Sequence, residues 1–152
     1  MLSFDSALGP LTIVSSDMGI TQVQFKASDA GDGTQLEQWA REEIESYLAG
    51  QRREFSVPLD RKALQVKRSF HDEVRHHLAS ISYGETRTYG EIAAELGRPG
   101  AARAVGTACA RNPLPILVPC HRVLASKGLG GYLGGLPAKQ YLLALEGIHW
   151  QP

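Results

Sequence analysis

The sequence predicts a small α+β unit over residues 1–60, with an antiparallel sheet and one helix, followed by a mostly α-helical unit over residues 61–152 that contains a helix-turn-helix. Two observations predict this division. Strand-like patterns dominate the first part, whereas helical spacing dominates the second. The charge also changes, because residues 1–60 hold four Lys/Arg and ten Asp/Glu (net −6), whereas residues 61–152 hold twelve and six (net +6). The asymmetry is either a chance division of surface charge or a sign that the C-terminal unit meets nucleic acid.

The composition narrows the class of protein. The chain has 152 residues and is 43% apolar, which suits one or two small folded units. No apolar stretch approaches the roughly 18 residues of a membrane-spanning helix, and the N-terminus lacks the regions of a signal peptide. The two cysteines form no CxxC pair and no disulfide framework. We therefore expect a cytoplasmic protein in a reducing compartment, with no membrane segment.

Three segments of the N-terminal unit predict strands. Residues 3–17 hold two β-rich runs on either side of Gly9-Pro10, which is a turn signal. Residues 19–26 alternate in the manner of a strand, and residues 54–60 predict a short edge strand.

One segment of this unit predicts a helix. Thr34 lies three residues before Glu37 in a capping-box pattern, apolar residues follow at helical spacing, and Gly50 ends the helix. The unit has no polar cluster that indicates chemistry, so we expect a structural support.

An apolar stripe over residues 66–82 predicts the first helix of the C-terminal unit. His71, His76 and His77 lie on or beside this helix and could suggest a metal site. No cysteine or carboxylate is suitably spaced around them, which favours solvated histidines.

Two further helices follow, over residues 89–96 and 101–111, with a break at residues 97–100. This is the spacing of a helix-turn-helix, and two packed helices of a bundle are the alternative. The second helix is rich in Ala and Gly, so its backbone can lie close to a partner. Arg103 is the long cationic side chain near its N-terminus.

The last part of the chain predicts a loop and a helix. Five glycines lie between residues 128 and 135, but their spacing does not match a dinucleotide-binding fingerprint. Pro137 opens a helix in its first turn, Glu146 lies in its last turn, and Gly147 follows as a cap.

Cys120 lies in the stretch "ILVPCHRV" (116–123) and has three possible roles, which are inert packing, metal ligation or nucleophilic attack. A free thiol has a pKa near about 8.5 and needs a base or a cationic neighbour to react. His121 can act as that base through a water if the chain is extended here, and Glu146 can orient it. Cys109 lies among small apolar residues, where packing is expected. A helix-turn-helix, a basic unit and a thiol together suggest a thiol that acts on nucleic acid.

Three segments resemble the O6-alkylguanine-DNA alkyltransferase family. "NPLPILVPCHRV" (112–123) is similar to its active-site signature, and "GETRTYGEIAAELGRPGAARAVGTACARNP" (84–113) is similar to its helix-turn-helix. "GYLGGLPAKQYLLALEG" (131–147) resembles its active-site loop and last helix. The resemblance covers about residues 66–150, and the N-terminal unit fits the family's ribonuclease H-like first domain in architecture and length.

The resemblance implies DNA repair by a single-turnover, irreversible reaction. An alkylated base, O6-alkylguanine or also O4-alkylthymine, is flipped out of duplex DNA, and the Cys120 sulfur takes its alkyl group. His121 would be the base, Glu146 would orient it, Asn112 would hold the turn, and Tyr89 would rotate the phosphate and donate to the leaving base.

The resemblance also implies how DNA is held. Arg103 would fill the vacated position in the base stack, while the small residues of its helix enter the minor groove with weak sequence preference. The residues implied in DNA contact are Tyr89, Ala102, Arg103, Thr107 and Arg122. Those implied in the substrate pocket are Pro115, Val123, Gly131, Tyr132, Leu133 and Lys139.

Leu133 is a departure, because many relatives carry Ser or another small residue there. Its bulk narrows the pocket, and it offers no hydroxyl donor. The chain also lacks the Cys/His set of a structural zinc, so we expect no metal, no cofactor and a monomer.

Two alternatives place the chain in other functional classes. A non-catalytic relative would bind alkylguanine in DNA without reacting, but such relatives replace the cysteine, and Cys120 argues against this. A plain helix-turn-helix module would leave His121, Glu146, Asn112 and Tyr89 without a shared purpose.

Overall fold

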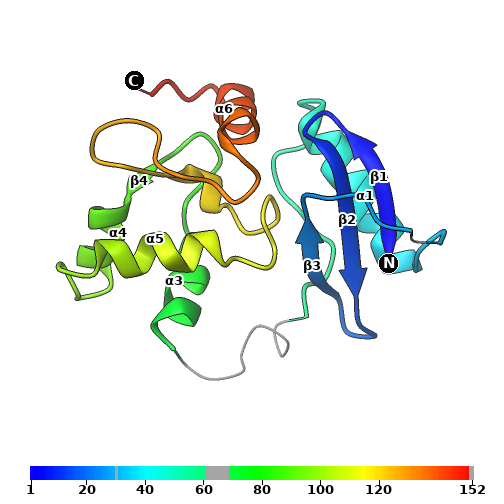
Figure 1. Ribbon diagram of the computed structural model, residues 1–152, viewed down its shortest axis with the longest axis horizontal. Helices are drawn as coiled ribbons and strands as arrows, with labels where there is room; N and C mark the ends of the chain where they lie inside the picture. The colour runs from blue at the N-terminus through cyan, green and yellow to red at the C-terminus, as the bar shows by residue number, and fades with distance from the viewer. Residues whose placement is uncertain (30, 61–68, 151–152) are drawn as a thin grey trace. The chain divides into compact units, whose positions relative to one another are not determined.

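The computed structural model describes residues 1–29, 31–60 and 69–150. The chain divides into two compact units, Met1–Val66 and Lys67–Pro152. This division falls within residues 61–68, outside the described ranges, so the predicted boundary between residues 60 and 61 stays a prediction. The predicted fold class is confirmed, because an antiparallel sheet with a helix precedes a mostly helical unit (Figure 1).

The N-terminal sheet has three antiparallel strands in the order β1-β2-β3, namely β1 (Leu2–Ser6), β2 (Gly9–Ser15) and β3 (Ile20–Gln24). Period-two alternation buries one face, and Phe4 lies opposite Leu11 in register. The turn between β1 and β2 is Ala7-Leu8. Gly9-Pro10 was expected to form it, but these residues pair within β2 with Ser6 and Asp5.

Helix α1 (Gln35–Leu48) covers the sheet and contacts all three strands (Figure 1). Its predicted capping box is confirmed, because the Thr34 hydroxyl accepts from the Glu37 N–H and the Glu37 carboxylate accepts from the Thr34 N–H. The helix buries Ala40, Ile44 and Tyr47 at helical spacing.

The strand predicted at residues 54–60 is wrong, because only an isolated bridge, Ile20 with Leu59, forms there. The Ser56 and Val57 N–H groups donate to the buried carboxylate of Glu43, each over 2.9 Å. Their donors are therefore used by a side chain and cannot extend the sheet.

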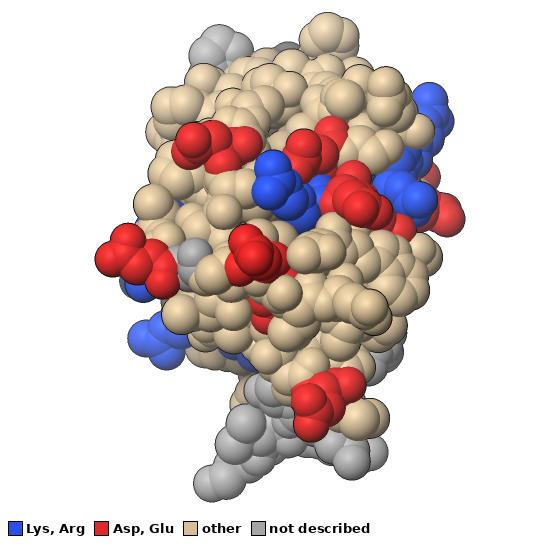
Figure 2. Space-filling model, turned by 90° about the vertical axis from the view of Figure 1, so that its right-hand side faces the viewer, with Lys and Arg blue, Asp and Glu red and all other residues tan. Residues whose placement is uncertain are grey.

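Asp and Glu side chains are spread over the face in Figure 2, with Lys and Arg between them, so this face has no single-sign patch.

The C-terminal unit begins with α3 (Phe70–Leu78), which a Ser69–Asp72 capping box starts. The predicted helix over residues 66–82 was too long at its C-terminal end, where Ala79 is the cap and Ile81 is buried beyond it. Val66 lies outside the described residues.

The predicted helix-turn-helix is α4 (Tyr89–Glu95) followed by α5 (Ala102–Ala110). Thr88 caps α4 through a capping box with Glu91. Helix α5 packs against both α3 and α4, and small residues along α5 allow this close approach.

The remaining elements are the 3₁₀ turn η1 (Cys120–Arg122), the strand β5 (Val123–Leu124) and helix α6 (Leu136–Leu145). Strand β5 pairs in parallel with β4 (Arg87–Thr88). Because α4 follows β4 directly and η1 precedes β5, this short ladder holds the start of the helix-turn-helix beside the cysteine turn. No helix of the described residues is long and apolar enough to cross a membrane.

Glu43→Gln should destabilise the N-terminal unit by about 1–3 kcal/mol, because it replaces the carboxylate that accepts from Ser56 and Val57. Burial alone raises the pKa of Glu43, but these hydrogen bonds lower it below 4.5 overall. The ionised carboxylate therefore stabilises the fold at pH values above its usual pKa. This stabilisation is lost as the pH falls through the pKa of Glu43 in the folded protein.

Urea unfolding of the wild type and the variant at about pH 7 and about pH 3 measures this. The wild type should lose more stability than Glu43→Gln on acidification. Glu42→Gln, an exposed neighbour on α1, is the matched control, and equal losses in both variants would contradict the assignment.

Candidate active site

Cys120 is the first residue of η1 and is only 2% exposed. Its N–H donates to the Val118 carbonyl oxygen over 2.8 Å, and the Arg122 N–H donates to Pro119 over 3.1 Å. The chain is therefore wound into one tight turn here, and the extended conformation expected at residues 120–121 is wrong. Pro119 before the turn restricts the backbone that enters it.

Asn112 holds the segment that leads to this turn. Its side-chain amide donates to the Val118 carbonyl over 3.1 Å and accepts from the Leu114 N–H over 3.0 Å. The same side chain hydrogen-bonds the Cys120 thiol. The structure thus places Asn112 where the sequence predicts it, between the end of α5 and the cysteine.

Glu146, the C-cap of α6, lies at the centre of a buried cluster. One carboxylate oxygen lies 2.8 Å from His121 Nε2 and accepts from Arg122 Nη2 over 3.0 Å. The other accepts from Arg122 Nε over 2.8 Å and from the Gly84 N–H over 3.0 Å. The carboxylate therefore contacts two consecutive residues of η1 and a loop 62 positions earlier in the chain.

Burial and the charges of this cluster together decide the protonation of His121. Burial alone raises the pKa of Glu146, but the hydrogen bonds from His121 and Arg122 hold it well below its usual range. Burial lowers the pKa of His121, although Glu146 opposes this. His121 is then neutral beside an ionised carboxylate, which can only accept. Nε2 must therefore carry the ring proton, and Nδ1 is the basic nitrogen.

Arg122 has a different place from the DNA contact that the sequence predicts. Its side chain is 9% exposed, and its guanidinium donates to Glu146 as a fork and to the Ile81 carbonyl oxygen over 2.6 Å. A guanidinium used in this way is not free for a phosphate, so the structure assigns Arg122 to positioning Glu146 instead.

Cys120 faces a cavity of about 490 Å³. The residues that line the cavity come from α4, α5, η1 and the glycine-rich loop, and they are Tyr89, Ala102, Arg103, Gly106, Cys109, Ala110, Cys120, Gly131, Tyr132 and Leu133. Burial raises the pKa of Cys120 to about 11, although the Asn112 hydrogen bond and the Lys139 charge oppose this. At neutral pH the sulfur is therefore a thiol, and it needs a base to react.

Three of the predicted pocket residues, Gly131, Tyr132 and Leu133, line this cavity. Val123 is fully buried in the core and Pro115 is buried beside Val118, and neither is among the residues that line the cavity. The prediction missed Gly106, Cys109 and Ala110. Their positions relative to Ala102 follow helical spacing, which could have identified this face of α5.

Lys139 is fully buried behind the cavity and fixes the loop in front of it. Its ammonium group donates to the Val123 and Gly131 carbonyl oxygens over 2.6 and 2.9 Å. Burial lowers the pKa of Lys139 to about 8.

The same loop passes close to Tyr89 at Gly130, which has φ +74. An added Cβ there would lie 2.8 Å from Tyr89 Oη, so only glycine allows this approach.

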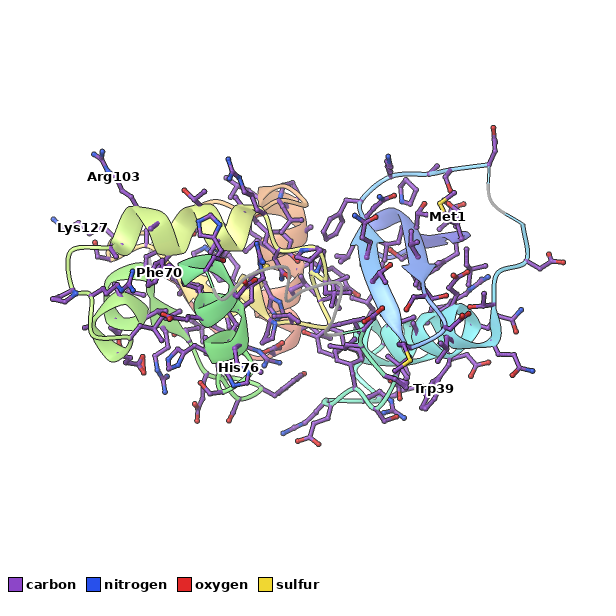
Figure 3. The ribbon with its side chains drawn as sticks, turned by 90° about the horizontal axis from the view of Figure 1, so that it is seen from below. Met1, Trp39, Phe70, His76, Arg103 and Lys127 are labelled. Atoms are coloured by element: carbon purple, nitrogen blue, oxygen red, sulfur yellow. The ribbon has the colours of Figure 1, made fainter. Side chains whose placement is uncertain are left out.

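Arg103 is exposed at the start of α5 and extends away from the helix (Figure 3). Lys127 extends outward at the same end of this view. Thr107 is exposed, and Ala102 is partly exposed. The three residues predicted on the DNA-facing side of α5 are therefore accessible, and Tyr89 is half-buried beside them at the cavity.

The described residues contain no group of three or more His, Cys, Asp or Glu side chains that could hold a metal ion. His76 is exposed on α3 (Figure 3), and His77 lies 3.4 Å from a carboxylate oxygen of Glu95.

Comparison with known proteins gives consistent results for both units. The model described as the ribonuclease-like domain of 6-O-methylguanine DNA methyltransferase matches residues 3–61, and the one described as its DNA binding domain matches residues 69–148. The methylated-DNA--protein-cysteine methyltransferases of Methanosarcina acetivorans and Mycolicibacterium paratuberculosis are 42% and 43% identical to this chain. The aligned regions span 95% of this chain in both cases, and 96% and 90% of those proteins.

Solved structures show the same similarity. The crystal structure of Mycobacterium tuberculosis OGT in complex with DNA is 40% identical, with a TM-score of 0.82, and the match covers 95% of this chain and 91% of that one. A crystal structure of the O6-methylguanine methyltransferase of the same organism has a TM-score of 0.81 at 40% identity, and the match covers 95% of this chain and 90% of that one.

Glu146→Gln should lower the free energy of unfolding by about 3–5 kcal/mol, because it leaves the buried Arg122 guanidinium without its counter-ion. Chemical denaturation measures this loss. Glu95→Gln is the control, since Glu95 is a partly exposed carboxylate that pairs with Arg87 and His77, and its loss should be about 0–1 kcal/mol. Similar small losses in both variants would show that Glu146 does not hold the site.

Proposed function

The chain belongs to the 6-O-methylguanine DNA methyltransferase family, whose members repair DNA by methyl transfer to a protein cysteine, and we propose that Cys120 is the acceptor. The observation that carries this proposal is the position of Cys120 in a cavity whose other wall is α5, the second helix of the helix-turn-helix. Cys109, the other cysteine, has alanine on both sides in the sequence and no base next to it.

We propose that His121 is the base that takes the Cys120 proton. Its Nε2 proton is held by Glu146 over 2.8 Å, so Nδ1 is left as the acceptor, and a water can pass the proton from sulfur to it. The sulfur then attacks the carbon on guanine O6 as the carbon–oxygen bond breaks, and the electron pair stays on the base. The new thioether does not release the alkyl group, so each molecule acts once.

Tyr89 is proposed to stabilise the base as it leaves. The tyrosine lines the cavity, and burial raises the pKa of its phenol, which therefore stays protonated and can donate. Its hydroxyl lies 3.5 Å from the Gly131 carbonyl oxygen, a long contact that a substrate can replace. A donor aimed at developing negative charge lowers the barrier of the transfer.

The proposed substrate is O6-alkylguanine in duplex DNA, and also O4-alkylthymine, flipped into the cavity from the minor groove. The exposed Arg103 and Thr107 and the partly exposed Ala102 on α5 support this, because small residues permit close approach and Arg103 can occupy the vacated stack. Leu133 lines the cavity and is proposed to limit the size of the adduct. Action as a monomer in the cytoplasm and a boundary between residues 60 and 61 stay predictions.

The two alternative functions account for less of the site. A non-catalytic DNA-binding protein would not require the buried Cys120 thiol, nor the adjacent His121 whose Nε2 lies 2.8 Å from a Glu146 carboxylate oxygen. A plain helix-turn-helix module would not need the cavity behind α5.

Cys120→Ser should bind methylated DNA but gain no methyl group. Intact mass spectrometry after incubation with duplex DNA that contains O6-methylguanine measures the transfer. The wild type should gain one methyl group on the peptide that holds Cys120. The variant should gain none, because a serine hydroxyl is a much weaker nucleophile than a cysteine thiol. Cys109→Ser is the matched control and should still be methylated, and label on Cys120→Ser would overturn the assignment.

Arg103→Ala should slow repair of duplex DNA by about tenfold or more, as expected for the loss of a contact of roughly 1.4 kcal/mol or more in the flipped complex. Reaction with the free base O6-benzylguanine needs no flipping and should change little. The ratio of the two rate constants is the measurement, with Arg111→Ala, an exposed residue just beyond α5, as the control. Equal loss on both substrates would exclude the role in the base stack.

A further inference from the structure

A second thiol lines the same cavity as Cys120. Cys109 lies in the last turn of α5 and Cys120 begins η1, yet both border the cavity of about 490 Å³. Both thiols are free, and both belong to one buried cluster. The proposed transfer uses only Cys120, so Cys109 is a buried nucleophilic group with no assigned role at the place where an alkyl group arrives.

Asn112 contacts both cysteines. Its N–H donates to the Cys109 carbonyl oxygen over 3.2 Å, and its side chain hydrogen-bonds the Cys120 thiol. Because Asn112 also holds the segment between the two cysteines through Val118 and Leu114, the two residues stay on adjoining walls of the cavity. The pair is therefore a fixed feature of the site.

We propose that the chain captures both ends of a two-carbon alkyl group that carries a second leaving group, with Cys120 as first acceptor and Cys109 as second. The substrate class is O6-(2-haloethyl)guanine in duplex DNA. The proposal rests on the proposed function, because Cys120 must first take the alkyl group from guanine. The product is a bridge of two methylene groups between the two sulfurs.

The two steps balance without an oxidant or a cofactor. In the first, a bond forms between the Cys120 sulfur and the carbon on O6, the carbon–oxygen bond breaks, and guanine keeps the electron pair. In the second, the Cys109 sulfur attacks the outer carbon, the carbon–halogen bond breaks, and halide leaves with the pair. The thiol proton of Cys109 passes to solvent. A bridge with two extra carbons is also less demanding in geometry than a direct disulfide.

The electrostatics of the cavity favour this order. Burial raises the pKa of Cys109 to about 12 and that of Cys120 to about 11. Cys120 also has the proposed base His121 next to it in the chain, so Cys120 reacts first. Its thioether then holds the outer carbon in the cavity that Cys109 also lines, which replaces a bimolecular encounter by an intramolecular step.

The test uses the full chain and a duplex oligonucleotide that carries O6-(2-chloroethyl)guanine, with an O6-ethylguanine duplex as the monofunctional control. Intact mass and the number of free thiols are measured on the molecules that have reacted. The chain has two cysteines, so a bridge leaves no free thiol and no chlorine, whereas ethyl transfer leaves one thiol. Cys109→Ala should show chloroethyl or hydroxyethyl thioether at Cys120 and no bridge.

The outcomes separate the two proposals. Bridged wild-type protein, with the crosslinked peptides of Cys109 and Cys120 found after proteolysis, supports the inference. Ethyl transfer together with an unbridged thioether and one free thiol in the chloroethyl arm overturns the inference and leaves the proposed function intact. No ethyl transfer overturns both. Because only reacted molecules are compared, a change in the rate of the Cys109 variant does not affect the result.

Discussion

The buried carboxylate of Glu146 is the contact on which the active-site geometry depends. It accepts hydrogen bonds from His121, from Arg122 as a fork and from the Gly84 N–H. These partners belong to η1 and to the loop before β4, while Glu146 itself ends α6. A carboxylate at a helix C-terminus faces an unfavourable dipole, and the guanidinium of Arg122 offsets it. The same interactions that hold three segments together therefore set the tautomer of the proposed base.

The approach to the cysteine turn is held from the other side by Asn112, and the backbone is strained there. Ile116 is buried at 1% exposure and has φ +74, a left-handed conformation that costs a β-branched residue about 1–3 kcal/mol. Hydrogen bonds of Asn112 to Leu114 and Val118 lie on both sides of it. The conformation persists because these contacts and the buried side chain over-determine the turn, and it brings the chain back from the end of α5 to Cys120.

The sequence predicted the elements with strong local signals and failed where a distant side chain decides. The capping box at Thr34 starts a helix as expected, because it needs only residues three positions apart. The strand at residues 54–60 fails because Glu43, on another element, takes its N–H groups. The resemblance implied that Arg122 contacts DNA, and the sequence around it gives no sign that a carboxylate 24 positions away holds its guanidinium.

The burial of Cys120 explains how a reactive site can remain quiet. A thiol with a pKa near 11 and 2% exposure presents little thiolate to reagents in solution. Reaction then requires a substrate that enters the cavity. The proposed base, His121, follows Cys120 directly in the chain. Helix α5 lines that cavity and carries exposed residues proposed to meet DNA. Ala102 and Arg103, which are proposed to meet DNA, therefore border the same cavity as the Cys120 sulfur.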